Sequence, residues 1–104
     1  MELYIDTRTA DPDLYQIGNW IKIRFRDNFD DAISAERIST TKVKIKVVEV
    51  AEANRNKGRG TALVQKLFDL LPSEVDCVVL GSNDAPEWWR KIKYRIRGGD
   101  KLVL

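Results

Sequence analysis

The first half of the chain alternates between hydrophobic and polar residues with a period of two, which is typical of β-strands that bury one face. We expect strands over residues 2–8, 20–26, 32–40 and 41–50. Pro12 can open a short helical turn between the first two strands. The acidic segment 27–31 predicts a turn between the second and third, because Asp and Asn side chains bond their own backbone in turns.

The fourth predicted strand contains a break in its alternation. Val43, Ile45 and Val47 are expected to share one face, with lysines at positions 42, 44 and 46 on the other. At Val47-Val48 one extra residue separates the two halves of the strand. A β-bulge would account for the extra residue and would expose backbone groups to a ligand.

The hydrophobic period then changes from two to that of a helix. Apolar residues at positions 62, 63, 67, 70 and 71 predict a helix over residues 61–71, closed by Pro72. Residues 75–80 form an apolar run that predicts a buried strand. A second helix is expected through Trp88, Trp89 and Ile92, with Pro86 in its first turn and an N-cap supplied by residue 82, 83 or 84. Residues 94–104 are expected to form a final pair of strands folded at 98–100.

This order of elements predicts one α+β domain that spans residues 1–104. A hydrophobic content of 43% favours a folded domain over a disordered chain.

Composition excludes several classes of chemistry. The chain contains no histidine and a single cysteine, Cys77, which removes Ser-His and Cys-His nucleophilic systems, the usual zinc sites and any internal disulfide. Cys77 begins an apolar run and is interpreted as a small buried hydrophobic residue. No long hydrophobic run or signal peptide is visible, so we expect a cytoplasmic protein without membrane association and without a bound metal.

Net charge is only +2, but the charges are unevenly distributed. Acidic residues dominate the first third, whereas basic residues dominate from Lys42 onward. One interpretation is solvated strand and helix faces, and the other is an anionic ligand bound by the second half of the chain. Nucleic acid is the less favoured anion, because the basic residues surround one loop and alternate along a strand and no nucleic-acid motif is present.

The segment Arg55-Asn56-Lys57-Gly58-Arg59-Gly60 carries the clearest chemical signal. It lies between a strand and a helix, where the first helical N–H groups lack intrahelical partners and the helix dipole favours an anion. The two glycines let the backbone approach a ligand, and three basic side chains add charge. The spacing fits neither a P-loop nor the three-glycine dinucleotide fingerprint. The alternative is an ordinary strand-to-helix turn that carries basic side chains.

This segment resembles the Arg/Gln-x-x-Gly-x-Gly/Ala signature of the GNAT family of N-acetyltransferases, which bind acetyl-CoA. Residues 85–94 resemble a second GNAT motif, Ala-x-x-Phe-Tyr-x-Lys-Leu-Gly-Phe, and lie at the expected distance. The resemblance covers roughly residues 41–94. It implies a minimal GNAT-like α+β fold, with a mixed, mostly antiparallel sheet and two flanking helices after the fourth strand. In such a fold Val50 would contact the pantetheine arm, main-chain amides of Arg55 to Thr61 would hold the pyrophosphate and Asn83 would lie near the arm. The pyrophosphate-binding set would be Arg55, Asn56, Lys57, Gly58, Arg59, Gly60 and Thr61.

Catalytic residues are harder to assign. The family often uses a tyrosine as general acid, but Trp89 occupies that position here, and an indole nitrogen cannot deliver a proton. Tyr94 is nearby and is the remaining candidate acid, although the motif places a packing aromatic there. Glu49 is the best candidate base for an attacking amine, with Glu52 as an alternative. Solvent could also protonate the departing thiolate.

The resemblance therefore predicts transfer of an acetyl group from acetyl-CoA to a primary amine, by direct attack without a covalent enzyme intermediate. The acceptor would be a protein lysine, an N-terminus or a small amine, and a homodimer is possible. The acidic segment 27–31 would attract a cationic amine if it faced the acceptor site. The alternative is a catalytically reduced module that binds CoA or a protein partner.

Overall fold

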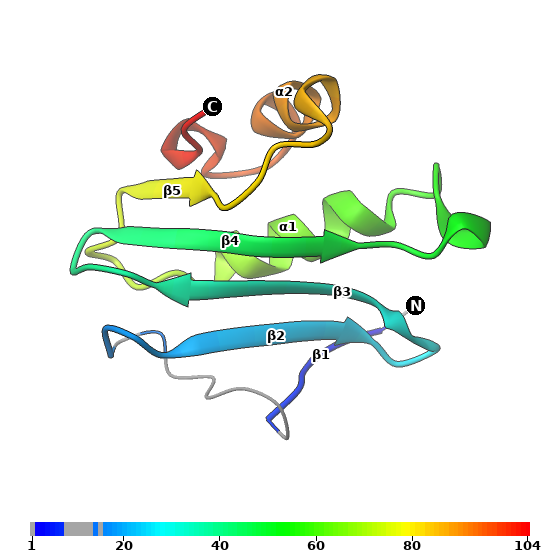
Figure 1. The fold of residues 1–104 in the computed structure, drawn as a ribbon, viewed down its shortest axis with the longest axis horizontal. Coiled ribbons are helices and arrows are strands. Elements are labelled where there is room, and N and C mark those ends of the chain that lie inside the picture. The colour runs from blue at the N-terminus through cyan, green and yellow to red at the C-terminus, as the bar shows by residue number, and fades with distance from the viewer. Residues whose placement is uncertain (1, 8–13, 15) are drawn as a thin grey trace.

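The computed structural model describes residues 2–7, 14 and 16–104. The predicted helical turn after Pro12 falls largely outside these described residues. Five strands form one sheet in the order β1-β2-β3-β4-β5 (Figure 1). The pairs β1–β2, β2–β3 and β3–β4 are antiparallel, whereas β5 runs parallel to β4. The strands are β1 Leu3–Ile5, β2 Trp20–Phe25, β3 Asn28–Arg37, β4 Lys42–Glu49 and β5 Cys77–Leu80.

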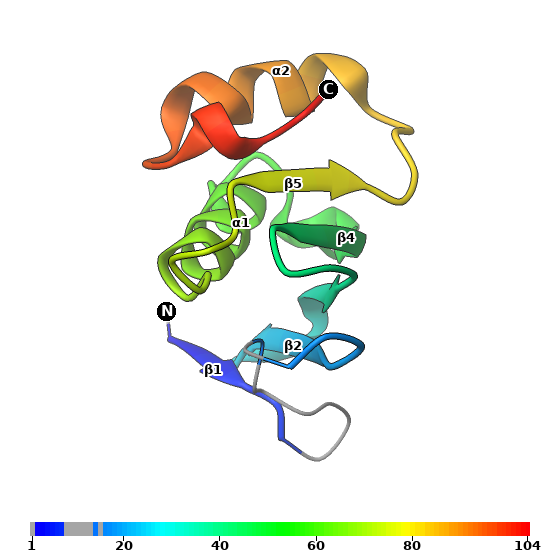
Figure 2. The same cartoon turned by 90° about the vertical axis from the view of Figure 1, so that its left-hand side faces the viewer.

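Two α-helices complete the domain, α1 Arg59–Asp69 and α2 Pro86–Arg95. Helix α1 packs against β2, β3 and β4 and covers one face of the sheet, while α2 lies beyond β5 (Figure 2). Two short 3-10 turns, η1 Glu52–Asn54 and η2 Gly99–Lys101, precede α1 and follow α2. The predicted α+β class, with a mixed and mostly antiparallel sheet and two helices, is confirmed.

The core lies between α1 and the sheet, as the period-two pattern requires. Ile21, Ile23 and Phe25 alternate with polar neighbours on β2 and are all buried. They pack with Leu63 and Leu67, which lie one helical turn apart on α1. The hydrophobic face of each element is therefore turned toward the other, and this packing fixes α1 against the strands that carry the site.

Several predicted boundaries are wrong. The turn between β2 and β3 occupies only residues 26–27, and β3 begins at Asn28, whose side chain accepts the Asp30 N–H at 3.0 Å. Helix α1 begins two residues earlier than predicted because Gly58, at φ 77°, already acts as its N-cap. Helix α2 has Ala85 as its N-cap instead of a polar residue from 82–84, while Pro86 does lie in its first turn.

The predicted final pair of strands is also wrong. Tyr94 and Arg95 continue α2, and Gly98, at φ 80°, opens η2. Strand pairing near the C-terminus is limited, over the described residues, to a single parallel bridge between Leu102 and Val78. Lys93 helps to hold this segment, because its ammonium group donates to the carbonyls of Gly99 and Leu102.

Candidate functional site: a groove between diverging strands

The candidate site begins where β5 separates from β4. Pairing between them ends at Ile45 and Leu80, and the Gly81 N–H donates to the Ile45 carbonyl at 2.8 Å. Strand β4 then continues to Glu49, whereas the segment that follows β5 turns away toward α2. The divergence leaves an open groove of about 760 Å³ between the second half of β4, the N-terminus of α1 and the start of α2. Backbone groups along this edge of β4 are thus accessible to a ligand.

A β-bulge lies where the groove begins. Ser34 pairs with Val47 and Ala35 pairs with Ile45, so Lys46 is the extra residue in β4. The bulge predicted at Val47-Val48 is thus confirmed to within one or two residues. The predicted inward position of Val47 is wrong. Its side chain is 37% exposed, while Val48, beyond the bulge, packs against the core.

The loop before α1 has the backbone geometry of an anion site. Asn56 and Gly58 both adopt positive φ, at 63° and 77°. Gly58 is the N-cap of α1 and supplies no side-chain cap, and the first intrahelical bond is donated by the Ala62 N–H to the Gly58 carbonyl at 3.0 Å. The three preceding amides have no intrahelical acceptor and lie at the groove, which Gly58, Arg59, Gly60 and Thr61 all line. The helix dipole places partial positive charge there.

Arg59 departs from its predicted role as an added positive charge for a phosphate. Its side chain is 7% exposed and points toward the β2–β3 hairpin. The guanidinium bonds Asp31 at 2.7 Å and Asp27 at 2.7 and 3.2 Å, and its centre lies 4.0 Å from the centroid of the Phe25 ring. Because two carboxylates and an aromatic face already surround this cation, Arg59 anchors the helix and does not offer a free charge to the groove.

Asp31 lies at the centre of the contacts that shape the loop. Its fully buried carboxylate accepts the Ala51 N–H at 2.6 Å, the Asn54 side-chain amide at 2.9 Å and Arg59 at 2.7 Å. Burial alone would raise the pKa of Asp31, but these three bonds outweigh it and hold the pKa below the usual value. Asp31 is therefore ionised and fully engaged at neutral pH.

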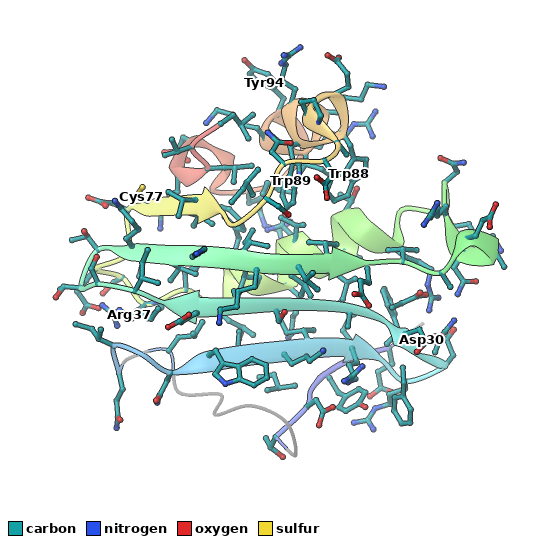
Figure 3. All side chains as sticks on the ribbon, in the orientation of Figure 1. Asp30, Arg37, Cys77, Trp88, Trp89 and Tyr94 are labelled. Carbon is teal, nitrogen blue, oxygen red and sulfur yellow. The ribbon has the colours of Figure 1, made fainter. Side chains whose placement is uncertain are left out.

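The acidic segment does not supply the amine-attracting surface that the sequence suggested. Asp31 is buried, and the pKa of Asp27 is lowered chiefly by its hydrogen bond with Arg59. Asp30 is exposed but lies at the β2–β3 end of the molecule and does not line the groove (Figure 3). Among the residues that do line the groove, the carboxylates are Glu49 and Asp84.

Two adjacent tryptophans form one wall of the groove. Trp88 is half-buried and Trp89 is buried, and their rings meet edge to face with centroids 4.8 Å apart. Both rings lie on the side of α2 that faces the rest of the domain (Figure 3). A Cβ atom on Gly60 would lie 2.7 Å from Cζ2 of Trp88, so Gly60 is needed to let the helix N-terminus approach this wall. The requirement comes from protein packing and exists without any ligand.

The remaining predicted cofactor residues divide into two groups. Val50, Arg55 and Asn56 line the groove, and the Val50 carbonyl accepts Nε of Arg55 at 3.1 Å. Lys57 and Asn83 are exposed and do not line it, although Ser82 and Asp84 on either side of Asn83 do.

The structure places the two predicted catalytic residues in different parts of the molecule. Glu49 is exposed and lines the groove at the end of β4. Tyr94 is 85% exposed on the side of α2 that points away from the groove (Figure 3). The structure therefore brings together the candidate base and the predicted pyrophosphate loop but leaves the candidate acid outside.

Sequence reasoning missed two cations that line the groove, Lys91 and Arg95. They follow Trp88 by three and seven residues, so helical spacing places all three on one face of α2. Neither takes part in an ion pair within the described part of the chain, whereas the neighbouring Arg90 pairs with Glu87 at 2.9 Å. With Arg55 on the opposite side, the groove carries an excess of positive charge.

No group of His, Cys, Asp and Glu side chains in the described ranges is arranged to hold a metal ion. Neither of the helices described here has the length and apolar character needed to cross a lipid bilayer. Comparisons of the chain with protein-family models, with curated proteins and with solved structures find no match.

Proposed function

We propose that the groove binds acetyl-CoA and that the protein is an N-acetyltransferase with a minimal GNAT-like fold, acting on a primary amine. The observation that carries this proposal is the placement of an uncapped helix N-terminus beside the open edge of β4, in a single groove. The helix N-terminus can bind a pyrophosphate through its free amides. The open edge of β4 can pair with the amide groups of a pantetheine arm, as an exposed strand edge pairs with a peptide.

The electrostatics of the groove agree with this ligand. Arg55, Lys91 and Arg95 line the same groove as the N-terminus of α1, and Arg59 is already neutralised by its two carboxylates. A ligand with several phosphate charges would meet backbone amides and unpaired cations together. Because one exposed helix terminus contributes only about 0.3–1 kcal/mol, binding of useful strength requires this convergence.

Glu49 is the proposed general base in this reaction. It lies on β4 at the groove, where an amine that attacks the thioester carbonyl could pass its proton to the carboxylate. The nitrogen forms the new amide bond as the carbon–sulfur bond breaks, and the departing thiolate takes a proton from water. Solvent can fill this role because the groove is open, and none of the described tyrosines lines it.

A second candidate function is a module that binds CoA without catalysis. It is favoured by one observation: the position of the family's general acid holds Trp89, which is buried against Trp88. The two functions share a ligand and differ in turnover. Release of CoA from acetyl-CoA in the presence of a panel of lysine peptides, N-terminal peptides and small amines separates them.

Ligand binding itself is tested by thermal unfolding with and without acetyl-CoA. Saturation at about 100 times Kd stabilises the fold by about 2.7 kcal/mol, a shift of several degrees for a domain of this size. The informative variant is Thr61→Asp, because an acidic residue in the first turn favours the helix but repels a pyrophosphate. Ser73→Asp makes the same charge change on an exposed residue beyond the other end of α1 and serves as the matched control.

We expect acetyl-CoA to stabilise the parent and the Ser73 variant but not the Thr61 variant. A parent that shows no shift at millimolar acetyl-CoA would exclude both candidate functions. An equal shift in all three proteins would place the ligand elsewhere on the molecule.

A further inference from the structure

We infer that Asp31 is the positioning residue of the loop between β4 and α1, which it holds in its binding conformation from a strand outside the groove. The assignment rests on the hydrogen bonds that Asp31 makes, whereas its consequence for acetyl-CoA affinity rests on the proposed function. Sequence separation makes the role non-local, because the carboxylate joins residues 20, 23 and 28 positions further along the chain.

The three contacts of Asp31 fall at the three points that define the path of the loop. The Ala51 N–H marks the exit from β4, since Ala51 follows the strand by two residues and is the N-cap of η1. Asn54 is the last residue of η1, and Arg59 is the first residue of α1. One side chain therefore fixes the start, the middle and the end of the connection.

The chemistry of these contacts requires a carboxylate. All three partners are donors, and the two oxygens of an ionised aspartate accept all of them. An asparagine keeps one acceptor oxygen and adds an amide that would face the Arg59 and Asn54 donors. The buried guanidinium of Arg59 would then keep only Asp27, whose side chain is 59% exposed, as its charged partner.

The position of Arg59 at the start of α1 also indicates that a carboxylate is required. A cation in the first turn of a helix opposes the helix dipole, so its presence there needs a compensating anion. Asp31 supplies that anion from β3, so the Arg59 side chain is bound to the β2–β3 hairpin while residues 59–61 line the groove. The pair thereby separates the anchoring charge from the binding surface.

Hydrogen exchange measured without ligand tests this role directly. Asp31→Asn is expected to raise amide exchange over residues 51–61 by about tenfold or more, the loss expected for a charge-assisted hydrogen bond. The matched control is Asp6→Asn, because Asp6 is equally buried and also bonds an arginine, Arg24 at 2.6 Å, but follows β1 at the edge of the sheet opposite β5. Its effect should be confined to β1, β2 and the start of β3, where Arg24 also donates to the Phe29 carbonyl. Faster exchange throughout the chain in both variants would overturn the assignment.

A milder variant covers the case in which Asp31→Asn does not fold. Asn54→Ala removes one of the three contacts from a half-buried side chain and is expected to raise exchange over 51–58 without affecting the sheet. Unchanged exchange in this variant would contradict the positioning role.

Ligand affinity completes the test. If the parent binds acetyl-CoA, Kd should rise about tenfold or more in the Asp31 variant and less than about twofold in the Asp6 variant at a temperature where both are folded. Equal losses in the two variants would show a general effect of stability. A parent that fails to bind acetyl-CoA removes the proposed function, while the exchange result still decides the role of Asp31.

Discussion

Gly60 and Trp88 meet where the first turn of α1 passes the first turn of α2, and the contact leaves no room for a side chain on the glycine. A Cβ atom built on Gly60 lies 2.7 Å from Cζ2 and 3.3 Å from Cη2 of the indole. The second glycine of the loop motif is thus explained by the packing of two helices. Both residues line the groove, so the same contact brings its Trp88 wall close to the N-terminus of α1.

Gly60→Ala should therefore displace the Trp88 ring without unfolding the protein. Alanine gains about 0.5–1 kcal/mol over glycine in a helix, which offsets part of the cost of moving a half-buried ring. We expect a change in tryptophan fluorescence, an unfolding free energy within about 1 kcal/mol of the parent and weaker binding of acetyl-CoA. Trp88→Phe should restore much of the affinity in the double variant, which a double-mutant cycle would measure as coupling. Strict additivity would show that the two residues act independently.

Much of this arrangement followed from the sequence, because the hydrophobic periods of β2, β4 and α1 are strong and local. The alternation of Ile21, Ile23 and Phe25 placed one sheet face, and the break at Val47-Val48 located the bulge. The predicted C-terminal pair of strands was wrong because Tyr94 and Arg95 extend α2, although the fold expected at 98–100 does coincide with the start of η2 at Gly98.

The polar network of the site could not be obtained in the same way. Asp31 looked like one of several acids in a hairpin turn, and its partners lie up to 28 residues away. A signal emerges only once Gly58 is recognised as the N-cap, because Arg59 then occupies the first position of α1, where a cation opposes the helix dipole and needs nearby carboxylates. The hydrophobic pattern alone did not show which carboxylate pairs with Arg59, because that depends on where β3 begins after the turn.

The network also predicts how stability depends on pH. The pKa of Asp31 is held below its usual value of 3.8, so its contribution to stability is complete above that value and is lost as the pH falls through the lower folded-state pKa. At neutral pH, Asp31→Asn should lower the free energy of unfolding by about 2–4 kcal/mol, because it leaves buried donors unpaired. The difference between parent and variant should shrink below about pH 4, as measured by urea unfolding. A difference that stays constant to about pH 2 would mean that the Asp31 charge does not matter.

Glu49 is the lining carboxylate best placed to serve as a base, and its replacement should separate chemistry from binding. Glu49→Gln is expected to lower kcat by about 100-fold or more while leaving Kd for acetyl-CoA and the melting temperature nearly unchanged, because the side chain is exposed. Glu52→Gln is the matched control, since Glu52 is exposed in η1 and does not line the groove. A larger loss in the Glu52 variant would transfer the role to that residue.

The motif and the structure give opposite indications of whether Tyr94 is catalytic. The motif made it a candidate acid, but its ring is 85% exposed and lies beside a separate surface hollow formed with residues 93–100. Since a general acid must reach the leaving sulfur directly or through one water, a residue on the opposite side of α2 cannot act in this groove. Tyr94→Phe should therefore leave kcat and its pH profile within about twofold of the parent. A loss of 100-fold or more, with unchanged acetyl-CoA binding, would instead require the last turn of α2 to rearrange when the acceptor binds, because the chain between Trp89 and Tyr94 forms one continuous helix.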